Sequence, residues 1–525
     1  MDAAIDPLAA HAAATPDAIA VVVDDTGDAR ARVVTFAELD RMVNRLAHAL
    51  RALGVARGDR VVWCGPNSCE VLAILHAARK LGVIAVPLSY RFSADEMAYV
   101  IENSEATAVL VDGEYAATVA SVADRLHRVR AFVTYDARVP GLDAAPPEGF
   151  DHWDALLAEQ PDDEPPPLGA EVGGAMIYTS GTTGKPKGAL RTTTDRALVF
   201  AMLAKLDLLH PDPVHLTTGP LYHSGPLAFA SLAHTVGAPV IVLRRFDASA
   251  WIRVVREHRV TNTFSAPTQL KRIVGLPVAE LADADLSSMR CLIANAAPVP
   301  YALKEEVIAK LGDGFLYEVY GSTELGVTTI LEPADQLRKP GSCGLPYGGV
   351  RIRIIRDDGS EADPGEPGEL FIDTTLAMDG YHRSDEQLSQ LTDGTWKSVG
   401  DIAYVDDEGY VHICDRKKDM IISAGVNIYP AEIEAVLHSH PLVLDCAVFG
   451  IPDDEWGEAV HAIVQPKPGA ALDLDEVRAF VEPQLGRYKR PRTYEMREEL
   501  PRTDAGKLLK RVLRDEFWSG RGSLI

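Results

Sequence analysis

The chain has 525 residues, more than one hydrophobic core can organise, so we expect two or more domains. Hydrophobic residues make up 47% and charged residues 24% of the chain, which is typical of a globular protein. The formal net charge of −24 would repel nucleic acids and anionic membrane surfaces, so neither is an expected partner.

The cysteines and the first residues indicate a cellular compartment. The six cysteines include no CxxC pair, and the N-terminus MDAAIDPLAA lacks a basic segment followed by an apolar core. We therefore expect reduced thiols, no signal peptide and a cytoplasmic location. The most apolar window, residues 71–88, is interrupted by His76, Arg79 and Lys80, so we expect a buried helix and strand there and no integral membrane segment.

Helices and strands alternate in the first part of the chain. Thr35 can cap a helix whose apolar residues recur every three or four positions, and Gly54 ends it. Strands and helices are then expected in turn over 61–63, 69–81, 83–86, 94–102 and 107–111, and a similar rhythm returns over 240–264. Such repeats predict an α/β fold in which helices cover parallel sheets on both faces.

The pattern changes after about Pro346. Alternating residues at 351–356 and 369–373 predict exposed antiparallel strands, and hence a small β subdomain. We interpret the charged run 415–419 as a linker in which Asp415 and Asp419 are in solvent. This gives a large N-terminal domain over 1–414 and a small α+β C-terminal domain over 420–525.

The most distinctive stretch of the sequence is 178–188, YTSGTTGKPKG, which follows an apolar run. A strand followed by a hydroxyl- and glycine-rich loop can surround phosphate with backbone amides, because glycine has no Cβ to hold phosphate oxygens away. The loop is not a Walker A sequence, since that pattern has four residues between its glycines and this loop has two.

Three further motifs occur along the chain. They are NAAP at 295–298, YGSTE at 320–324 and LPRTDAGK at 500–507. Together with the loop, they resemble the adenylate-forming superfamily, which includes acyl-CoA synthetases, peptide-synthetase adenylation domains and firefly luciferase. The chain is most similar to a fatty-acid or related acyl-CoA ligase, and the resemblance spans nearly its whole length.

The resemblance implies an ATP-dependent acid:CoA ligase. Such an enzyme joins the acid to AMP and releases pyrophosphate, and the thiol of coenzyme A then displaces AMP. Mg²⁺ would assist, with Glu324 as its ligand. The nucleotide would contact Thr179, Ser180, Gly181, Thr182, Thr183, Gly184, Lys187, Asn295, Ala296, Ala297, Tyr320, Gly321, Thr323, Asp401, Arg416 and Lys507.

The resemblance also implies roles for individual residues. Thr323 would donate to the α-phosphate, and Lys507 would bridge that phosphate and the substrate carboxylate. His223 would stand between the acid pocket and the coenzyme A channel, which Ala424 and Gly425 would line. Lys418 would be the hinge about which a mobile C-terminal domain turns.

Asn295 departs from the family, whose members commonly have glycine at this position. Its side chain either points into the acid pocket or caps its own turn.

The sequence alone does not identify the carboxylic acid, or whether coenzyme A or a carrier protein supplies the thiol. The expected pocket residues are mostly apolar, which favours a fatty, aromatic or alicyclic acid over an amino acid: Leu221, Ala228, Phe264, Leu325 and Val327. The alternatives are a stand-alone adenylation enzyme that loads a carrier protein, a luciferase-like oxygenase, and a non-catalytic regulator that binds an acyl-adenylate. The regulator should have lost Lys507, Glu324 or the loop lysine, and this chain keeps all of them. A homodimer is a further open alternative.

Overall fold

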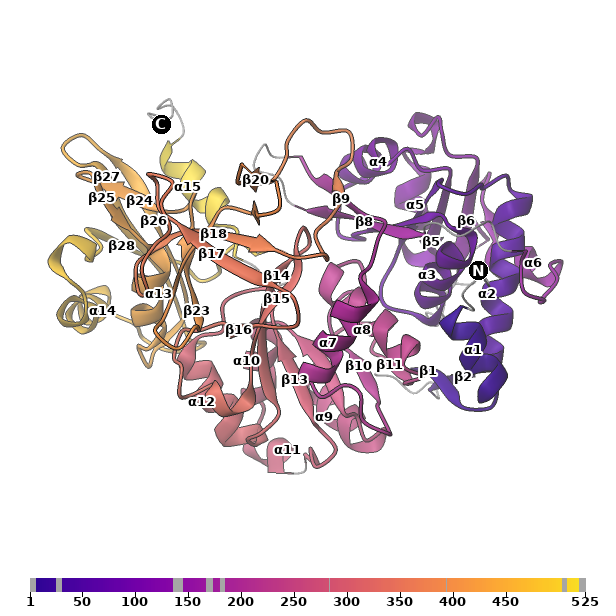
Figure 1. The fold of residues 1–525 in the computed structure, drawn as a ribbon, viewed down its shortest axis with the longest axis horizontal. Helices are drawn as coiled ribbons and strands as arrows, with labels where there is room; N and C mark the ends of the chain where they lie inside the picture. Colours follow the sequence, from indigo (N-terminus) through magenta and orange to yellow (C-terminus); the bar gives the residue numbers. More distant parts are fainter. Residues whose placement is uncertain are drawn as a thin grey trace.

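The computed structural model describes residues 6–24, 31–135, 145–166, 173–179, 185–282, 284–392, 394–502 and 508–518. Figure 1 shows an elongated molecule with the N-terminal strands and helices at one end and the C-terminal ones at the other. Within these described residues, four sheets make up the framework.

The first sheet lies at the N-terminal end. Its strands are β3 (Arg60–Cys64), β4 (Ile84–Leu88), β5 (Ala108–Asp112), β6 (Ala131–Tyr135), β7 (Asp151–His152), β8 (Gly174–Thr179), β9 (Lys187–Arg191) and β19 (Gly380–Tyr381). They lie in the order β19-β9-β8-β4-β3-β5-β6-β7, with parallel pairing from β8 to β7. The accompanying helices are α2 (Phe36–Ala52), α3 (Cys69–Leu81), α4 (Ala94–Asn103), α5 (Gly113–Ala120) and α6 (Trp153–Ala158).

The second sheet occupies the middle of the molecule. Its strands are β1 (Ile19–Val23), β2 (Arg32–Thr35), β10 (His215–Thr217), β11 (Val240–Val242), β12 (Asn262–Ser265), β13 (Cys291–Ala294), β14 (Leu316–Ser322), β15 (Gly326–Leu331) and β16 (Leu345–Pro346). From β14 to β1, neighbouring strands pair in parallel. The remaining helices of this half are α1 (Pro7–Ala14), α7 (Arg196–Lys205), α8 (Ser224–Thr235), α9 (Ala248–Glu257), α10 (Pro267–Val274), α11 (Val278–Ala282) and α12 (Tyr301–Leu311).

Two smaller sheets follow. The antiparallel β subdomain contains β17 (Arg351–Ile355), β18 (Gly368–Asp373), β20 (Ser389–Gln390), β21 (Lys397–Ser398), β22 (Asp401–Val405) and β23 (Val411–Arg416). The C-terminal part contains β24 (Ile421–Ser423), β25 (Val426–Ile428), β26 (Val443–Asp453), β27 (Gly457–Pro466), β28 (Thr493–Met496), α13 (Pro430–His438), α14 (Leu474–Val481) and α15 (Lys510–Trp518). The expected fold class, parallel α/β layers with a β subdomain and a small α+β unit, is confirmed.

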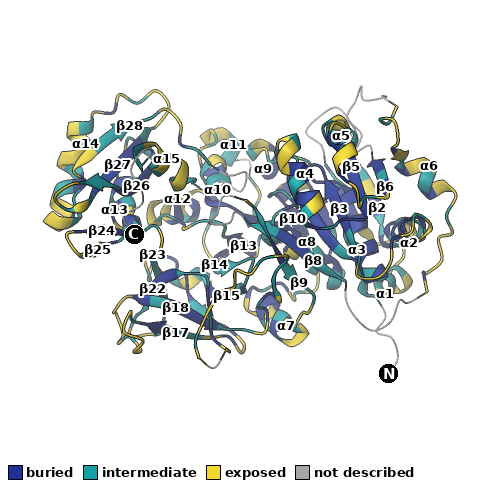
Figure 2. Ribbon diagram, turned by 90° about the horizontal axis from the view of Figure 1, so that it is seen from above, coloured by how far each residue is buried: buried dark blue, intermediate teal, exposed yellow. Residues whose placement is uncertain are grey.

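Local chemistry explains why these segments fold as they do. Helix α2 begins with a capping box: the Thr35 hydroxyl accepts from the Glu38 amide, and the Glu38 carboxylate accepts from the Thr35 amide. Helix α3 ends where Gly82 takes a left-handed conformation with φ 62°. Figure 2 shows the strands of both parallel sheets largely buried and the exposed residues mainly on helices and loops at the surface. Among the described helices, none combines the length and the apolar character that a membrane span requires.

The position of Asp415 shows that one prediction about the charged run 415–419, that this residue is in solvent, is wrong. Strand β23 continues to Arg416, so the first two residues of the predicted linker belong to the β subdomain. Asp415 is buried, and its carboxylate accepts hydrogen bonds from the amides of Arg416 (2.7 Å) and Ala431 (2.9 Å). Burial raises the pKa of Asp415. The prediction failed because a run of charges in sequence does not reveal partners that lie far along the chain.

Candidate functional site

A cavity of about 3410 Å³ lies between the parallel sheets and the C-terminal part. Parallel strands of the second sheet end at this cavity, where Thr218 and Gly219 follow β10, Ala266 follows β12, and Asn295 follows β13. Ligands of open α/β sheets bind at the carboxyl ends of the strands, so the topology itself favours a binding site here. The first sheet contributes the β8–β9 hairpin, and the C-terminal part contributes residues from Arg497 to Arg502.

Most predicted site residues that the structure describes line this cavity. They are Thr179, Lys187, His223, Asn295, Ala296, Gly321, Thr323, Glu324, Arg416 and Lys418. Ser180 to Gly184 and Lys507 lie outside the described residues. The structure describes Pro501, Arg502 and Leu509 to either side of Lys507, and these residues line the cavity.

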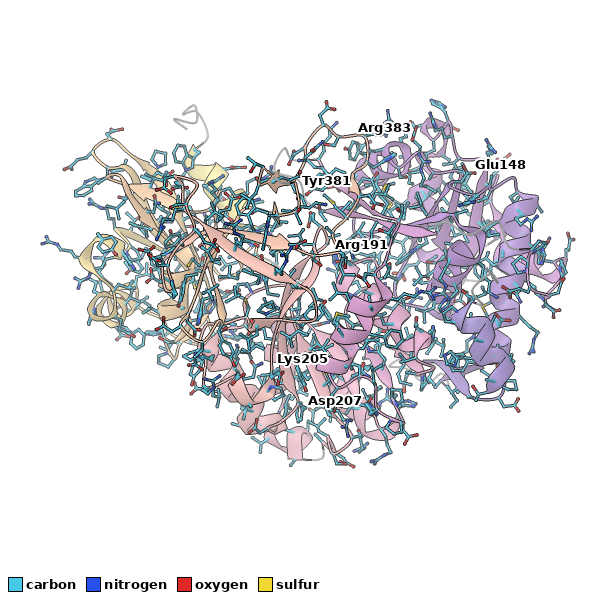
Figure 3. The ribbon with its side chains drawn as sticks, viewed as in Figure 1. Glu148, Arg191, Lys205, Asp207, Tyr381 and Arg383 are labelled. Atoms are coloured by element: carbon cyan, nitrogen blue, oxygen red, sulfur yellow. The ribbon has the colours of Figure 1, made fainter. Side chains whose placement is uncertain are left out.

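Glu324 is the centre of one cluster. Its Oε1 atom accepts hydrogen bonds from the hydroxyls of Thr179 (3.3 Å) and Tyr381 (3.0 Å). The preceding residue, Thr323, shares a hydrogen bond between its hydroxyl and that of Ser224 (3.0 Å), and its carbonyl accepts from Nη2 of Arg191 (2.9 Å). Figure 3 shows Arg191 and Tyr381 in the middle of the molecule, between the N-terminal sheet and the β subdomain. Hydroxyl and carboxylate oxygens meet here at one point of the cavity.

This donor set fits the predicted Mg²⁺. The ion prefers hard oxygen ligands and takes one or two carboxylates together with phosphate oxygens. Glu324 supplies a carboxylate, and the Thr179 hydroxyl lies beside it. Lys187 lines the same cavity, pairs with Glu386 and has its ammonium 5.8 Å from the centre of the Tyr381 ring. The cluster therefore combines oxygen ligands with a nearby cation, as a polyphosphate site requires.

Asp401, Arg416 and Tyr320 form a second cluster. The Tyr320 hydroxyl donates to Asp401, and Nε of Arg416 lies 3.2 Å from the other Asp401 oxygen. Burial, followed by the charge of Asp401, raises the pKa of Tyr320 well above its usual value. Strands β14, β22 and β23 bring these three residues together from distant parts of the sequence. Arg416 lines the cavity, whereas its partner Asp401 and Tyr320 are next to it and are not among the lining residues.

Asn295 holds its own turn. Its Nδ2 donates to the carbonyl of Val319 (2.5 Å), and its Oδ1 accepts from the amide of Ala296 (2.5 Å). Ala296 has a φ of 78°, a left-handed conformation that is unfavourable for residues other than glycine. Both ends of the side chain therefore contact backbone, which favours the turn-capping alternative over a side chain aimed into the acid pocket.

Other predicted residues lie away from the cavity. Ala424 and Gly425 form the exposed turn between β24 and β25 and do not line it. Ala297 also lies outside the lining. Among the expected acid-pocket residues, Ala228, Phe264 and Val327 line the cavity. Leu221 and Leu325 are instead buried in the hydrophobic core, which corrects both positions. Leu221 and Leu325 were wrongly predicted to line the acid pocket, because an apolar residue next to a motif can pack in the core as readily as it can line a pocket.

Sequence reasoning missed two polar residues of the site, Arg191 and Tyr381. Arg191 ends strand β9, where side chains alternate between the two faces of the sheet. Lys187, Ala189 and Arg191 therefore share one face, and all three line the cavity. This period of two could have identified Arg191 once Lys187 was assigned. Tyr381 lies on a two-residue strand far along the chain, and no local signal marks it.

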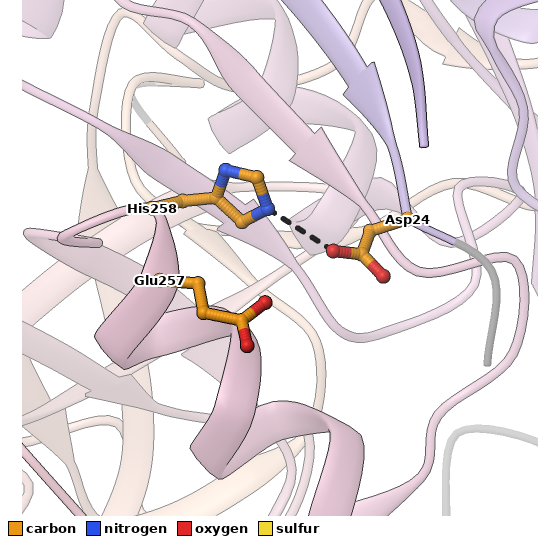
Figure 4. Close-up of side chains that lie close together, drawn as sticks. All are labelled: Asp24, Glu257 and His258. Atoms are coloured by element: carbon orange, nitrogen blue, oxygen red, sulfur yellow. Dashed lines mark hydrogen bonds and ion pairs between the residues drawn. The ribbon is translucent and has the colours of Figure 1, made fainter. Parts of the chain in front are cut away.

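A separate group outside the cavity contains Asp24, Glu257 and His258, close enough together to suggest a metal site (Figure 4). The Asp24 carboxylate, however, accepts hydrogen bonds from both terminal nitrogens of Arg253 and from Nε2 of His258 (3.0 Å). Burial opposes the charge of Asp24, yet the hydrogen bonds from Arg253 and His258 hold its pKa below the usual value. A guanidinium already neutralises this carboxylate, so we interpret the group as a structural ion pair.

Comparisons with known proteins agree with this geometry. A feruloyl-CoA synthase from Amycolatopsis sp is 38% identical over 490 residues, which cover 92% of this chain and 94% of that protein. An indoleacetate–CoA ligase from Aromatoleum aromaticum is 36% identical over 485 residues, covering 91% and 92% of the two chains. The solved structure of ATP-bound MatB from Rhodopseudomonas palustris has a TM-score of 0.84 at 28% identity and covers 98% of this chain and 99% of its own.

The family comparison covers both parts of the molecule. Residues 8–382 match the AMP-binding enzyme family, and residues 432–507 match the C-terminal domain of that family. The first match spans the two parallel sheets, including the strands whose carboxyl ends line the cavity. The second match ends at Lys507. The chain therefore belongs to the AMP-binding enzyme family, within the adenylate-forming superfamily that its motifs resemble.

Proposed function

We propose that this AMP-forming acid:CoA ligase activates an aromatic carboxylic acid. The observation that carries the proposal is an aromatic wall of the cavity made by Phe229 and Phe264. The rings of Phe229 and Phe264 stack with centroids 5.6 Å apart. Gly225 lies against Phe264 so closely that an added Cβ would come within 2.5 Å of the ring. A rigid, flat wall of this kind suits a planar substrate, because aromatic rings gain from ordered stacking.

The relatives support the same substrate class. The two relatives described above are named for feruloyl and indoleacetate groups, and both groups carry an aromatic ring. Saturated fatty acids are the alternative within the same chemistry, since an apolar wall accepts them as well.

The reaction follows from the chemistry of a carboxylate, which is a poor acyl donor. A carboxylate oxygen attacks the α-phosphorus of ATP, and the bond to the pyrophosphate leaving group breaks. The thiolate of coenzyme A then attacks the acyl carbon, and AMP leaves as the thioester forms. In this proposal Glu324 and Thr179 hold Mg²⁺, which offsets phosphate charge when bound. Asp401 and Arg416 bind the ribose.

The division of labour between domains is part of the proposal. Residues 1–416 bind ATP and the acid, residues 417–419 act as the hinge, and residues 420–525 supply Lys507. A cation placed between the carboxylate and the α-phosphate offsets the repulsion of two anions that must meet. The lining of the cavity by Pro501, Arg502 and Leu509, which lie close to Lys507 in the chain, supports this role.

Pyrophosphate release across a panel of acids tests the proposal. The panel contains 4-hydroxycinnamate, indole-3-acetate, cyclohexanecarboxylate, octanoate and palmitate, each with and without coenzyme A. We expect the highest kcat/KM for an aromatic acid, with sustained turnover only when coenzyme A is present. A preference for palmitate would contradict the aromatic assignment. Turnover with a phosphopantetheinylated carrier protein but not with coenzyme A would identify the protein as a carrier-loading enzyme instead.

A further inference from the structure

Arg191 is a cation of the cavity wall that carries no ionic partner within the part of the chain that the structure describes. Its Nη2 donates to the Thr323 carbonyl (2.9 Å), while its Nε is inaccessible to solvent and has no hydrogen-bond partner among the described residues. Among the residues that the structure describes, no carboxylate oxygen lies within 4.0 Å of the Arg191 guanidinium. The two nearby carboxylates are engaged elsewhere: Asp379 accepts from the amide and hydroxyl of Thr192, and Glu324 accepts from Thr179 and Tyr381.

An arrangement of this kind costs free energy in the unliganded protein. Burial lowers the pKa of Arg191, yet a guanidinium keeps its proton in proteins. A half-buried guanidinium whose partner among the described residues is one carbonyl is poorly compensated for the water that it has lost. Such a charge becomes favourable when an anion binds next to it. Arg191 lines the cavity, so a bound reactant can supply this anion.

The position of Arg191 indicates which anion it meets. Lys187 and Arg191 stand four residues apart on one face of β9, a separation of about 13 Å at the rise of an extended strand. Lys187 lies beside the phosphate loop and the Glu324 cluster. Arg191 lies at the other end of the strand, against Thr323. Thr323 is expected to contact the α-phosphate, which the acid attacks. The strand therefore presents one cation toward the polyphosphate and a second cation beside Thr323, where the carboxylate must approach.

We propose that Arg191 binds the carboxylate of the acid before it attacks ATP. This assignment rests on the proposed function, since it requires an acid to be bound together with ATP in this cavity. The bidentate fork of arginine matches a carboxylate, and Nε of Arg191 has no hydrogen-bond partner among the described residues. Once the acyl-adenylate has formed, the carboxylate charge is gone, so Arg191 acts in the first half-reaction only.

Three variants test the assignment. Arg191→Met removes the cation, Arg191→Lys keeps the charge without the fork, and Lys187→Met removes the cation at the polyphosphate end. We expect Arg191→Met to raise the KM for the acid by roughly tenfold to a hundredfold, the range of a lost charge-assisted hydrogen bond, and to change the KM for ATP little. Arg191→Lys should recover part of this loss. Lys187→Met should raise the KM for ATP instead.

Two further measurements separate this role from a structural one. Thioester formation from presynthesised acyl-adenylate should be unchanged in Arg191→Met. Its Tm without ligands should equal or exceed that of the unmodified protein, because a poorly compensated buried charge has been removed. A raised KM for ATP with an unchanged KM for the acid would overturn the assignment in favour of phosphate binding. A lowered Tm with unchanged KM values would overturn it in favour of a structural role.

Calorimetry of 4-hydroxycinnamate binding in the absence of ATP distinguishes failure of this inference from failure of the proposed function. Binding to the unmodified protein and loss of binding in Arg191→Met support the inference even if turnover is not observed. Equal binding to both proteins would overturn the inference while leaving the proposed ligase activity standing. Absence of acid-dependent pyrophosphate release in the unmodified protein would instead contradict the proposed function.

Discussion

At the scale of single residues, Asn295 stabilises a backbone conformation that its neighbour does not favour. Ala296 has a φ of 78°, and a non-glycine residue in this region costs about 1–2 kcal/mol. The Asn295 side chain offsets that cost because it accepts from the Ala296 amide and donates to the Val319 carbonyl. The turn that follows β13 at the cavity therefore depends on an amide side chain.

We expect Asn295→Gly to reduce stability and leave the preference among acids unchanged. Loss of the two hydrogen bonds should lower the free energy of unfolding by about 1–2 kcal/mol. Thermal unfolding measures the first effect, and relative kcat/KM over a chain-length series of acids measures the second. Ala296→Gly is the matched control, since it relieves the strain and should raise stability by up to about 1 kcal/mol. A changed ranking of acids at an unaltered Tm would show that the side chain reaches the acid.

At the scale of secondary-structure elements, three charged residues with little solvent exposure join two helices and a strand. Nζ of Lys510, the first residue of α15, lies 2.8 Å from Oε1 of Glu434 in α13, and the same oxygen accepts from the Val448 amide (2.7 Å). Asp415 at the end of β23 completes the group. Burial opposes the charge of Lys510, but Glu434 and Asp415 outweigh it and raise the pKa of Lys510. These contacts hold the helix that follows Lys507 against the end of the β subdomain.

We expect Lys510→Met to be strongly destabilising, because it leaves the Glu434 and Asp415 carboxylates buried without a counter-charge. Breaking a buried ion pair from one side costs about 3–5 kcal/mol. The double variant Lys510→Met with Glu434→Gln removes one of the stranded charges and should recover part of the loss. Chemical denaturation followed by circular dichroism compares the variants. If Lys510→Met unfolds at the same denaturant concentration as the unmodified protein, the three residues do not act as a compensated group.

The same elements show what the sequence could predict. The helix at 69–81 was predicted at its observed bounds, because its cap and its terminal glycine are local signals. The approach of Thr179 to Glu324 and of Asp401 to Arg416 was implied by family motifs rather than by periodicity. Asp415 was wrongly predicted to be in solvent, and Arg191 was missed as a site residue. The environment of each side chain depends on partners in distant segments. Local pattern thus predicted elements well, whereas the environment of single charges required the tertiary fold.

At the scale of the whole molecule, polar contacts among the described residues join the C-terminal part to the rest, in addition to those of Asp415. Nζ of Lys271 in α10 donates to the Leu444 carbonyl, and Nη1 of Arg514 in α15 donates to the carbonyl of Lys418 (3.1 Å). Residues from Arg497 to Arg502 complete one side of the cavity. We propose that this arrangement serves adenylate formation, and that a rotation at Lys418 produces a second arrangement for thioester formation.

A proline at position 418 tests this rotation. The hydrogen bonds of the turn use the amides of Lys417, which donates to Gly400, and of Asp419, which donates to Arg416, so Lys418→Pro removes neither of them. Proline fixes φ at 418 and restricts Lys417 as well. We therefore expect a single turnover of pyrophosphate release at the normal rate, followed by CoA-dependent turnover slowed by roughly tenfold or more, since the second arrangement becomes harder to reach.

Two control variants separate the effect of a fixed backbone at position 418 from the loss of a side chain. Lys418→Ala removes the same side chain but keeps the rotation, so it should turn over at nearly the normal rate with coenzyme A. Lys507→Ala should show the opposite defect, with adenylate formation abolished and thioester formation from presynthesised acyl-adenylate largely retained, because the lysine is needed only where two anions meet. Rapid-quench measurement of each half-reaction separates the three cases. Normal CoA-dependent turnover by Lys418→Pro would place the rotation elsewhere in the chain, because a fixed φ at the true hinge must slow the exchange between the two arrangements.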